Sequence, residues 1–168
     1  MRNKYAGLMQ YDIANAEDGI AVSFWVQGCP LHCKGCQNPQ TWNPNGGSDL
    51  PKDYLQQIDN MIEERPETIS CFSILGGEPF AEYNLSLTYE VIHHVSTKYP
   101  QLKIICWTGY TYEELRKRKD NYTQKLLIMI DTLIDGPFVE SKRDITLKLR
   151  GSANQRILHN NGKGEFYE

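Results

Sequence analysis

Short apolar segments that end at a glycine alternate along this chain with segments of helical periodicity. Leu55, Ile58 and Ile62 recur at the spacing of one helix face. The apolar segments are rich in β-branched and aromatic residues, and the clearest three are residues 19–26, 69–75 and 102–107. Parallel strands need a long crossover connection between them, which is usually a helix. The alternation therefore predicts an α/β fold with a mostly parallel sheet.

The length of the chain limits how far such a sheet can close. Residues 111–114 (TYEE) match the capping box of a further helix, and residues 126–134 and 145–149 are predicted to form two further strands. A closed barrel of eight βα units takes about 250 residues, whereas this chain has 168. We therefore expect a partial, open barrel of βα repeats with about five or six strands. No repeat, low-complexity tract or linker interrupts the pattern, so residues 1–168 are expected to form one domain.

Composition argues against a membrane protein and against a nucleic-acid-binding protein. The sequence has no run of the ~18 to 20 apolar residues that a membrane span needs, and its first five residues lack the apolar run of a signal peptide. A net charge of −3 does not favour a broad surface for nucleic acid. The one basic run, residues 116–119, follows Glu113 and Glu114 at helical spacing. It is interpreted as a solvated helix face, with a docking patch as the alternative. We expect a cytoplasmic protein.

Three of the five cysteines lie close together in the loop of residues 28–38. Cys29, Cys33 and Cys36 are separated by four and three positions, on a loop interrupted by glycine and proline, which suits one metal centre. A structural zinc takes four ligands, whereas three thiolates on an iron–sulfur cluster leave one iron open. The other two cysteines lie in apolar segments and are expected to be buried. An iron–sulfur cluster is favoured; a zinc-binding interaction module, with Cys71, Cys106 or a histidine as fourth ligand, is the alternative.

The spacing C-x-x-x-C-x-x-C after a first strand resembles the signature of the radical S-adenosylmethionine enzymes. The resemblance implies that Cys29, Cys33 and Cys36 hold a [4Fe–4S] cluster. It also implies that the amino and carboxylate groups of S-adenosylmethionine bind the open iron. The reduced cluster then cleaves the sulfonium to give methionine and a 5′-deoxyadenosyl radical. The protein mainly binds and orients the cofactor and excludes water.

A glycine pair followed by a glutamate comes directly after the second predicted strand. Gly76 and Gly77 allow a ligand to approach the backbone closely, and the carboxylate of Glu78 suits a cationic group better than a phosphate. In the radical S-adenosylmethionine family such a segment holds the methionine amino group. The resemblance further implies that Gly35, Cys36 and Gln37 pack against the adenine portion. Two strand-end residues, either ligands or ordinary surface groups, complete the set of cofactor candidates: Thr108 and Tyr110.

Three further stretches, residues 36–42, 135–138 and 150–156, resemble the activating proteins of anaerobic ribonucleoside-triphosphate reductase. That resemblance implies that the radical takes hydrogen from a glycine of the reductase, with reduced flavodoxin as electron donor. Hydrogen-atom abstraction needs no general base, so we expect no catalytic residues beyond the cluster ligands, and a structural or surface role for the histidines at 93, 94 and 159. Four residues near the C-terminus are hypothesised to orient the partner loop or the cofactor, with a solvated turn as the alternative: Arg150, Asn154, Gln155 and Arg156.

Two other enzyme functions are compatible with the same motifs. One is activation of a different glycyl radical enzyme of the pyruvate formate-lyase type, although those activators resemble longer chains. The other is radical chemistry on a free metabolite with a purine-like ring. The cofactor motifs alone do not choose between these substrates, because one fold serves many reactions.

Overall fold

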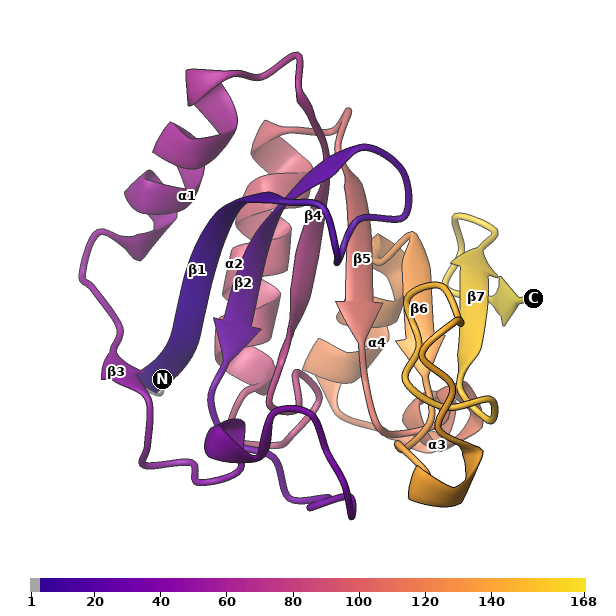
Figure 1. The fold of residues 1–168 in the computed structure, drawn as a ribbon. Helices are drawn as coiled ribbons and strands as arrows, with labels where there is room; N and C mark the ends of the chain where they lie inside the picture. Colours follow the sequence, from indigo (N-terminus) through magenta and orange to yellow (C-terminus); the bar gives the residue numbers. More distant parts are fainter. Residues whose placement is uncertain (1–3) are drawn as a thin grey trace.

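One eight-stranded sheet organises the computed structural model, which describes residues 4–168 (Figure 1). Its four central strands are parallel, and both pairs of outer strands are antiparallel to their neighbours. This confirms the α/β class and the parallel centre. In spatial order the strands are β3 (Ser48–Asp49), β1 (Lys4–Asp12), β2 (Ile20–Val26), β4 (Ile69–Gly76), β5 (Lys103–Trp107), β6 (Thr132–Asp135), β7 (Arg156–Asn160) and β8 (Phe166–Tyr167).

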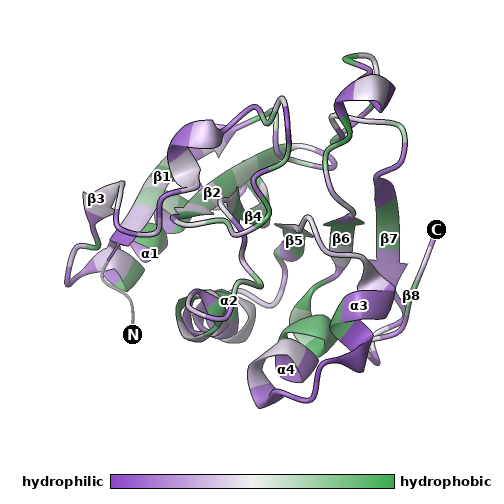
Figure 2. Cartoon of the chain, turned by 90° about the horizontal axis from the view of Figure 1, so that it is seen from below, coloured by the Kyte–Doolittle hydropathy of each residue, from purple (hydrophilic) through white to green (hydrophobic). Residues whose placement is uncertain are grey.

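Four α-helices cover one side of this sheet, and long loops lie on the other (Figure 2). The first two helices bury apolar side chains three and four positions apart, as amphipathic helices do. The predicted capping box is confirmed, because the Thr111 side chain accepts from the Glu114 N–H and Glu114 accepts from the Thr111 N–H. The helices are α1 (Tyr54–Glu64), α2 (Leu85–Lys98), α3 (Tyr112–Lys117) and α4 (Asn121–Met129), with short 3₁₀ turns η1 (Pro39–Thr41) and η2 (Glu140–Lys142).

The strand predicted over residues 126–134 is wrong in its first half. Residues 126–129 belong to α4, whose first turn is capped by the Asp120 side chain, and only β6 is extended. Thr123, Leu126 and Leu127 of α4 are buried three and four positions apart, as a helix face requires. The side-chain amide of Asn160 donates to the carbonyls of residues 127, 128 and 130, and so satisfies the end of the helix.

The strand predicted over residues 145–149 is also wrong. These residues lie in a long loop, in which the Ile145 side chain is 83% exposed and Leu149 has a left-handed φ of 59°. The described sheet has eight strands rather than five or six, because four outer strands that are short or half-exposed were not predicted: β1, β3, β7 and β8. A barrel is not confirmed, since β3 and β8 stand at opposite ends of the sheet. Of the predicted domain 1–168, residues 1–3 lie outside the described residues.

The parallel strands end at one edge of the sheet, and the loops that carry the sequence motifs leave from that edge. Phe24, Phe72 and Ile74 fill the core beneath the helices. The opposite face has a smaller core, in which Cys71 packs with Ile105. Both isolated cysteines, Cys71 and Cys106, are buried as predicted. Within residues 4–168, no helix is long and apolar enough to cross a membrane.

Candidate metal centre and cofactor cavity

The cysteine loop is fixed by backbone hydrogen bonds to the segment that follows it. The Gly28 N–H donates to the Thr41 carbonyl at 2.7 Å, and the Cys29 N–H donates to the Trp42 carbonyl at 3.1 Å. The His32 ring stacks on the Trp42 indole, with centroids 4.8 Å apart, while His32 itself has a left-handed φ of 47°. These contacts define the path of the loop, so the three thiols have positions set by the protein.

The glycine–glutamate turn packs directly against the cysteine loop. The Gly77 N–H donates to the Val26 carbonyl and the Glu78 N–H donates to the Gly28 carbonyl, each at 2.9 Å. A Cβ on Gly77 would lie within 3.0 Å of three backbone atoms of Gly28. Only glycine fits at this contact, which explains why the turn after β4 carries one.

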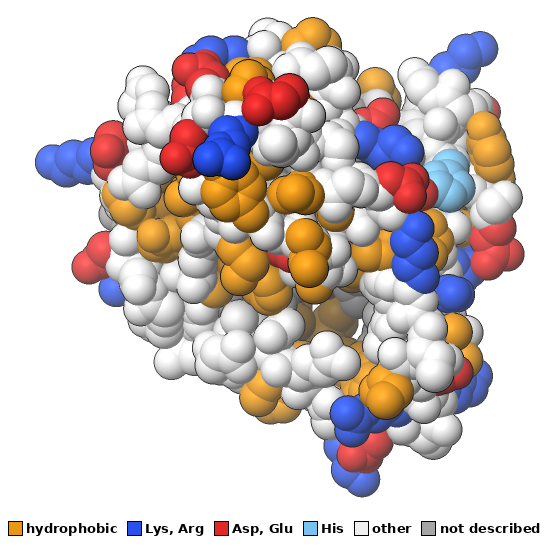
Figure 3. Space-filling view, turned by 45° about the horizontal axis from the view of Figure 1, so that its top comes forward, with side chains coloured by type: hydrophobic (Ala, Val, Ile, Leu, Met, Phe, Trp, Pro, Cys, Tyr) orange, Lys and Arg blue, Asp and Glu red, His pale blue; other side chains and the backbone are white. Residues whose placement is uncertain are grey.

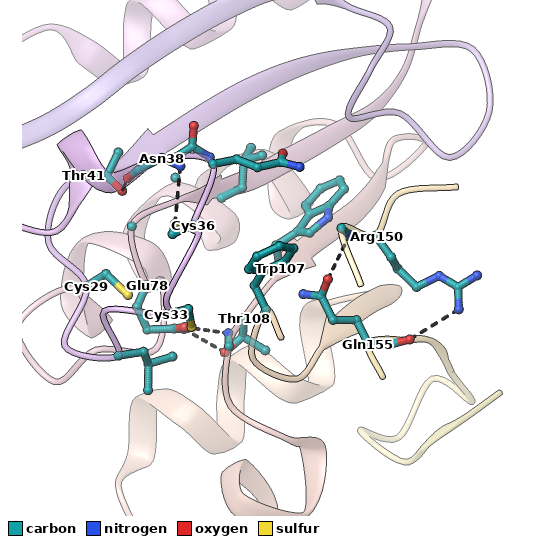
Figure 4. A pocket seen from close by; sticks show the side chains of 18 of the residues that line it. Cys29, Cys33, Cys36, Asn38, Thr41, Glu78, Trp107, Thr108, Arg150 and Gln155 are labelled. Atoms are coloured by element: carbon teal, nitrogen blue, oxygen red, sulfur yellow. Dashed lines mark hydrogen bonds between the residues drawn. The ribbon is translucent and has the colours of Figure 1, made fainter. Parts of the chain in front are cut away.

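A cavity of about 490 Å³ opens where these loops meet (Figure 4). Its wall contains most of the predicted site residues: Cys29, Cys33, Cys36, Gln37, Gly76, Gly77, Glu78 and Thr108. Burial raises the pKa of the Cys29 thiol, and the nearby Glu78 carboxylate raises it further. The motifs are thus brought together in space although they are 40 or more residues apart in the sequence.

Glu78 lies in this wall with its carboxylate fully engaged by internal donors. Oε1 accepts from the Thr108 hydroxyl at 2.7 Å and from the Phe80 N–H at 2.9 Å, and Oε2 accepts from the Gly109 N–H at 2.7 Å. Only 1% of the residue is exposed. Burial raises the pKa of this carboxyl, while the three donors oppose that rise. Glu78 therefore ties the end of β4 to the end of β5 as well as placing an acid at the cavity.

Two of the cofactor candidates lie away from the cavity wall. Gly35 has a left-handed φ of 76° and faces the Glu140 side chain. The Tyr110 ring lies under the Arg118 guanidinium, 4.2 Å from its centre, and this guanidinium also donates to the Phe80 carbonyl. Neither residue is part of the wall formed by the described residues.

The four C-terminal candidates make contacts within the chain. Arg156 forms ion pairs with Asp135 and Glu113, and the Asp135 side chain is only 1% exposed. Asn154 donates to the Pro137 carbonyl. Arg150 and Gln155 are the two of the four in the cavity wall, where the Gln155 side chain accepts from the Gly151 and Ser152 N–H groups and donates to the Gly136 carbonyl. These contacts hold the loop of residues 136–155 in place.

The three histidines expected to be structural lie outside the cavity wall, within the described chain. His94 bonds to the buried Asp59 at 2.8 Å and so joins α2 to α1. His93 stacks on Tyr89. His159 lies on β7, 3.7 Å from Glu17. No described histidine is placed to act as a base in the cavity.

Aromatic side chains in the wall were missed by the sequence reasoning. Trp107 follows Cys106 in β5, so the period of two places it on the loop side of the sheet, and its indole N–H donates to the Leu149 carbonyl at 2.8 Å. That alternation was the available signal. Four rings of the wall were not predicted: Trp25, Trp42, Trp107 and Phe138.

The residues of the wall fit an iron–sulfur cluster in their donor chemistry. Three thiols come from one loop, and the Asn38 N–H already donates to the Cys36 sulfur at 3.3 Å, as it would to a thiolate. The buried indole N–H groups of Trp25 and Trp42, two residues of the cavity wall, have no hydrogen-bond partner within residues 4–168. Within the same residues, no three His, Cys, Asp or Glu side chains lie close enough together to hold a single metal ion.

Comparison with known proteins assigns the chain to a family. Residues 17–158 match the model of the 4Fe-4S single cluster domain. The anaerobic ribonucleoside-triphosphate reductase-activating protein of Vibrio cholerae is 36% identical over 88% of this chain and 92% of its own length. The proteins of the same name from Haemophilus influenzae and Escherichia coli K12 are 34% and 31% identical, over 88% of this chain and 92% and 93% of theirs. The solved structure of Escherichia coli QueE, at 16% identity and a TM-score of 0.40 over 65% of this chain and 53% of its own, carries no weight in the assignment. This chain belongs to the family of anaerobic ribonucleoside-triphosphate reductase-activating proteins.

Proposed function

We propose that this chain activates an anaerobic ribonucleoside-triphosphate reductase by generating a glycyl radical on it. The supporting observation is that three thiols and the Gly-Gly-Glu turn border one cavity, in a chain whose relatives are named as activators of that reductase. Cys29, Cys33 and Cys36 are the proposed ligands of a [4Fe–4S] cluster. When bound, the reduced cluster supplies one electron that cleaves S-adenosylmethionine, and the resulting 5′-deoxyadenosyl radical takes a hydrogen atom from the glycine.

The chain's own residues bind and orient the cofactor in this proposal. Gly76 and Gly77 present backbone without Cβ atoms to the cavity, and Glu78 provides the negative charge expected beside an ammonium group. Since the Glu78 carboxylate already accepts three hydrogen bonds, it also positions the strand-end residue Thr108. Gln37, beside the last cysteine, is the candidate for contact with the adenine portion.

Hydrogen-atom transfer moves no separate proton, so the proposed reaction needs no general base. Trp25, Trp107 and Phe138 provide the apolar part of a mixed wall, and the Trp107–Leu149 hydrogen bond holds one side of it. We propose that the partial, open arrangement of βα units admits the target glycine from the side. A reduced flavodoxin is the proposed electron donor, and the cytoplasm, which keeps thiols reduced, is the proposed compartment.

Anaerobic loading and turnover test this proposal. The protein is expected to bind about four iron and four sulfide per chain, to cleave S-adenosylmethionine with dithionite as reductant, and to give a glycyl radical signal by electron paramagnetic resonance after addition of the reductase. Cys33→Ala should lose the cluster and both activities. Cys71→Ala is the matched control, because Cys71 is buried outside the cavity and should leave all three readouts unchanged.

Other outcomes would assign a different function. A colourless protein with one zinc and no iron would show an interaction module. Cleavage of S-adenosylmethionine without a radical on the reductase would redirect the search to a different glycyl radical enzyme or to a free metabolite.

A further inference from the structure

The proposed function requires one electron from outside the chain for each cleavage. Among residues 4–168 the only cysteines besides the three in the loop are Cys71 and Cys106, which are buried in separate strands. The described chain therefore has no second cysteine cluster that could pass an electron inward. A carrier protein therefore has to dock close to the cluster ligands. This requirement rests on the proposed function.

The two segments that meet at the cysteine loop carry a positive net charge. Residues 28–38 and 137–155 together contain five basic and two acidic residues, whereas the whole chain has a net charge of −3. Figure 3 shows basic and acidic side chains gathered on a projection at its lower right edge. The charge of these segments is thus opposite in sign to that of the molecule as a whole, which favours docking of an acidic partner at this place.

Lys34 joins the two segments directly beside the cluster ligands. It lies between Cys33 and Cys36, its side chain is 90% exposed, and its Nζ is 3.2 Å from Glu140 on η2. Glu140 in turn lies against Gly35. A shallow groove of about 360 Å³ follows this contact, and Phe138 and Val139 contribute to its wall.

Two further basic residues extend this surface. Lys142 and Arg143 follow Glu140 and are exposed, and neither has an acidic partner within the described part of the chain. Glu140 is neutralised by Lys34, and the nearby Asp144 accepts hydrogen bonds from Thr146. Asp144 keeps its negative charge, so the three basic residues outnumber the two acidic ones by one and the local net charge is positive. We call Lys34, Lys142 and Arg143 the basic lip.

We propose that the basic lip is the docking surface for an acidic one-electron carrier protein. The step transfers one electron: the carrier is oxidised by one electron, the cluster is reduced by one, and no bond or proton is exchanged. Lys34 follows Cys33 in the sequence, and adjacent Cα atoms are about 3.8 Å apart. A carrier that contacts Lys34 is therefore separated from the proposed cluster only by the cysteine loop. The reductase is a less suitable occupant, since its glycine has to enter the cavity rather than contact the outside of the loop.

The test measures reduction of the loaded cluster by reduced flavodoxin, followed by stopped-flow absorbance. The unmodified protein should react more slowly as salt rises, because the Debye length falls from about 10 Å at 0.1 M to about 3 Å at 1 M. The double variant Lys142→Glu, Arg143→Glu should react roughly tenfold more slowly at low salt, with the difference lost at high salt. The matched control is Arg116→Glu, Lys117→Glu on α3, which lies on the helix-covered side (Figure 2) and should match the unmodified rate.

Several results would overturn the docking surface. These are a reduction rate independent of salt in the unmodified protein, an unchanged rate in the lip variant, or an equal loss in the α3 variant. Loss of the glycyl radical in the lip variant with dithionite as reductant would assign the surface to the reductase instead. Failure of the unmodified, loaded protein to cleave S-adenosylmethionine with dithionite would refute the proposed function itself. The salt dependence of the unmodified protein tests the surface without relying on any variant.

Discussion

Replacement of Arg156 by methionine distinguishes a structural role from partner binding for this residue. The guanidinium contacts both oxygens of Asp135, at 2.9 Å and 2.5 Å, and reaches Glu113 at 2.7 Å. Methionine keeps much of the length of the side chain and removes the charge. Asp135 is then left as a buried carboxylate with the Tyr112 N–H as its remaining donor, at 2.7 Å.

The structure sets the size of the expected loss. Removing one partner of a buried ion pair costs about 3 to 5 kcal/mol, because the other charge remains buried without compensation. The Arg156 side chain is 32% exposed and the Tyr112 donor remains, so we expect the lower end, about 3 kcal/mol. For a domain of this size 1 kcal/mol shifts the melting temperature by about 2 to 4 °C, which predicts a decrease of about 6 to 12 °C.

Anaerobic thermal unfolding measures this decrease, and the glycyl radical yield at a temperature well below the transition measures function. We expect the melting temperature to fall while the yield per loaded protein stays within about twofold of the unmodified protein. Asp135→Asn, alone and combined with Arg156→Met, completes a double-mutant cycle in which the combined cost is smaller than the sum. A shift below about 2 °C together with a lost radical would refute the structural role and support orientation of the partner.

Three other substitutions test separate parts of the structure. Gly77→Ala should cost about 1 to 3 kcal/mol in chemical denaturation and weaken binding of S-adenosylmethionine, because its Cβ meets the Gly28 backbone; unchanged stability would contradict the close packing. Trp107→Phe should lose about 1 kcal/mol, since the hydrogen bond to the Leu149 carbonyl is removed while the ring is kept; a larger loss would indicate a packing role for the indole. The pKa of Asp59 is below its ordinary value. Burial raises this pKa, but the hydrogen bonds from Lys98, His94 and Tyr99 together lower it by more. The stabilisation by its charged form is present above about pH 4 and lost as the pH falls through the lowered pKa, so urea unfolding should show an acid-side decline that Asp59→Asn reduces.

The strands were predictable where a buried segment is also rich in residues that favour strands. The strands at residues 19–26 and 69–75 were correct to within a residue, because both carry consecutive β-branched and aromatic residues. Residues 126–134 were misassigned, since a short buried helix followed by a buried strand reads as one apolar run. The outer strands β1 and β7 were missed because half-exposed strands have a weaker apolar signal.

The sequence by itself was enough to propose the chemistry, and the tertiary structure decided which contacts the residues make. The spacing of Cys29, Cys33 and Cys36 is a local property, so one loop is enough to specify three thiols for one cluster. The role of Arg156 depends on contacts with β6 and α3, which a linear pattern does not encode. The same holds for the basic lip, because Lys34 and Glu140 are over 100 residues apart and meet only when the sheet aligns the ends of its strands at one edge.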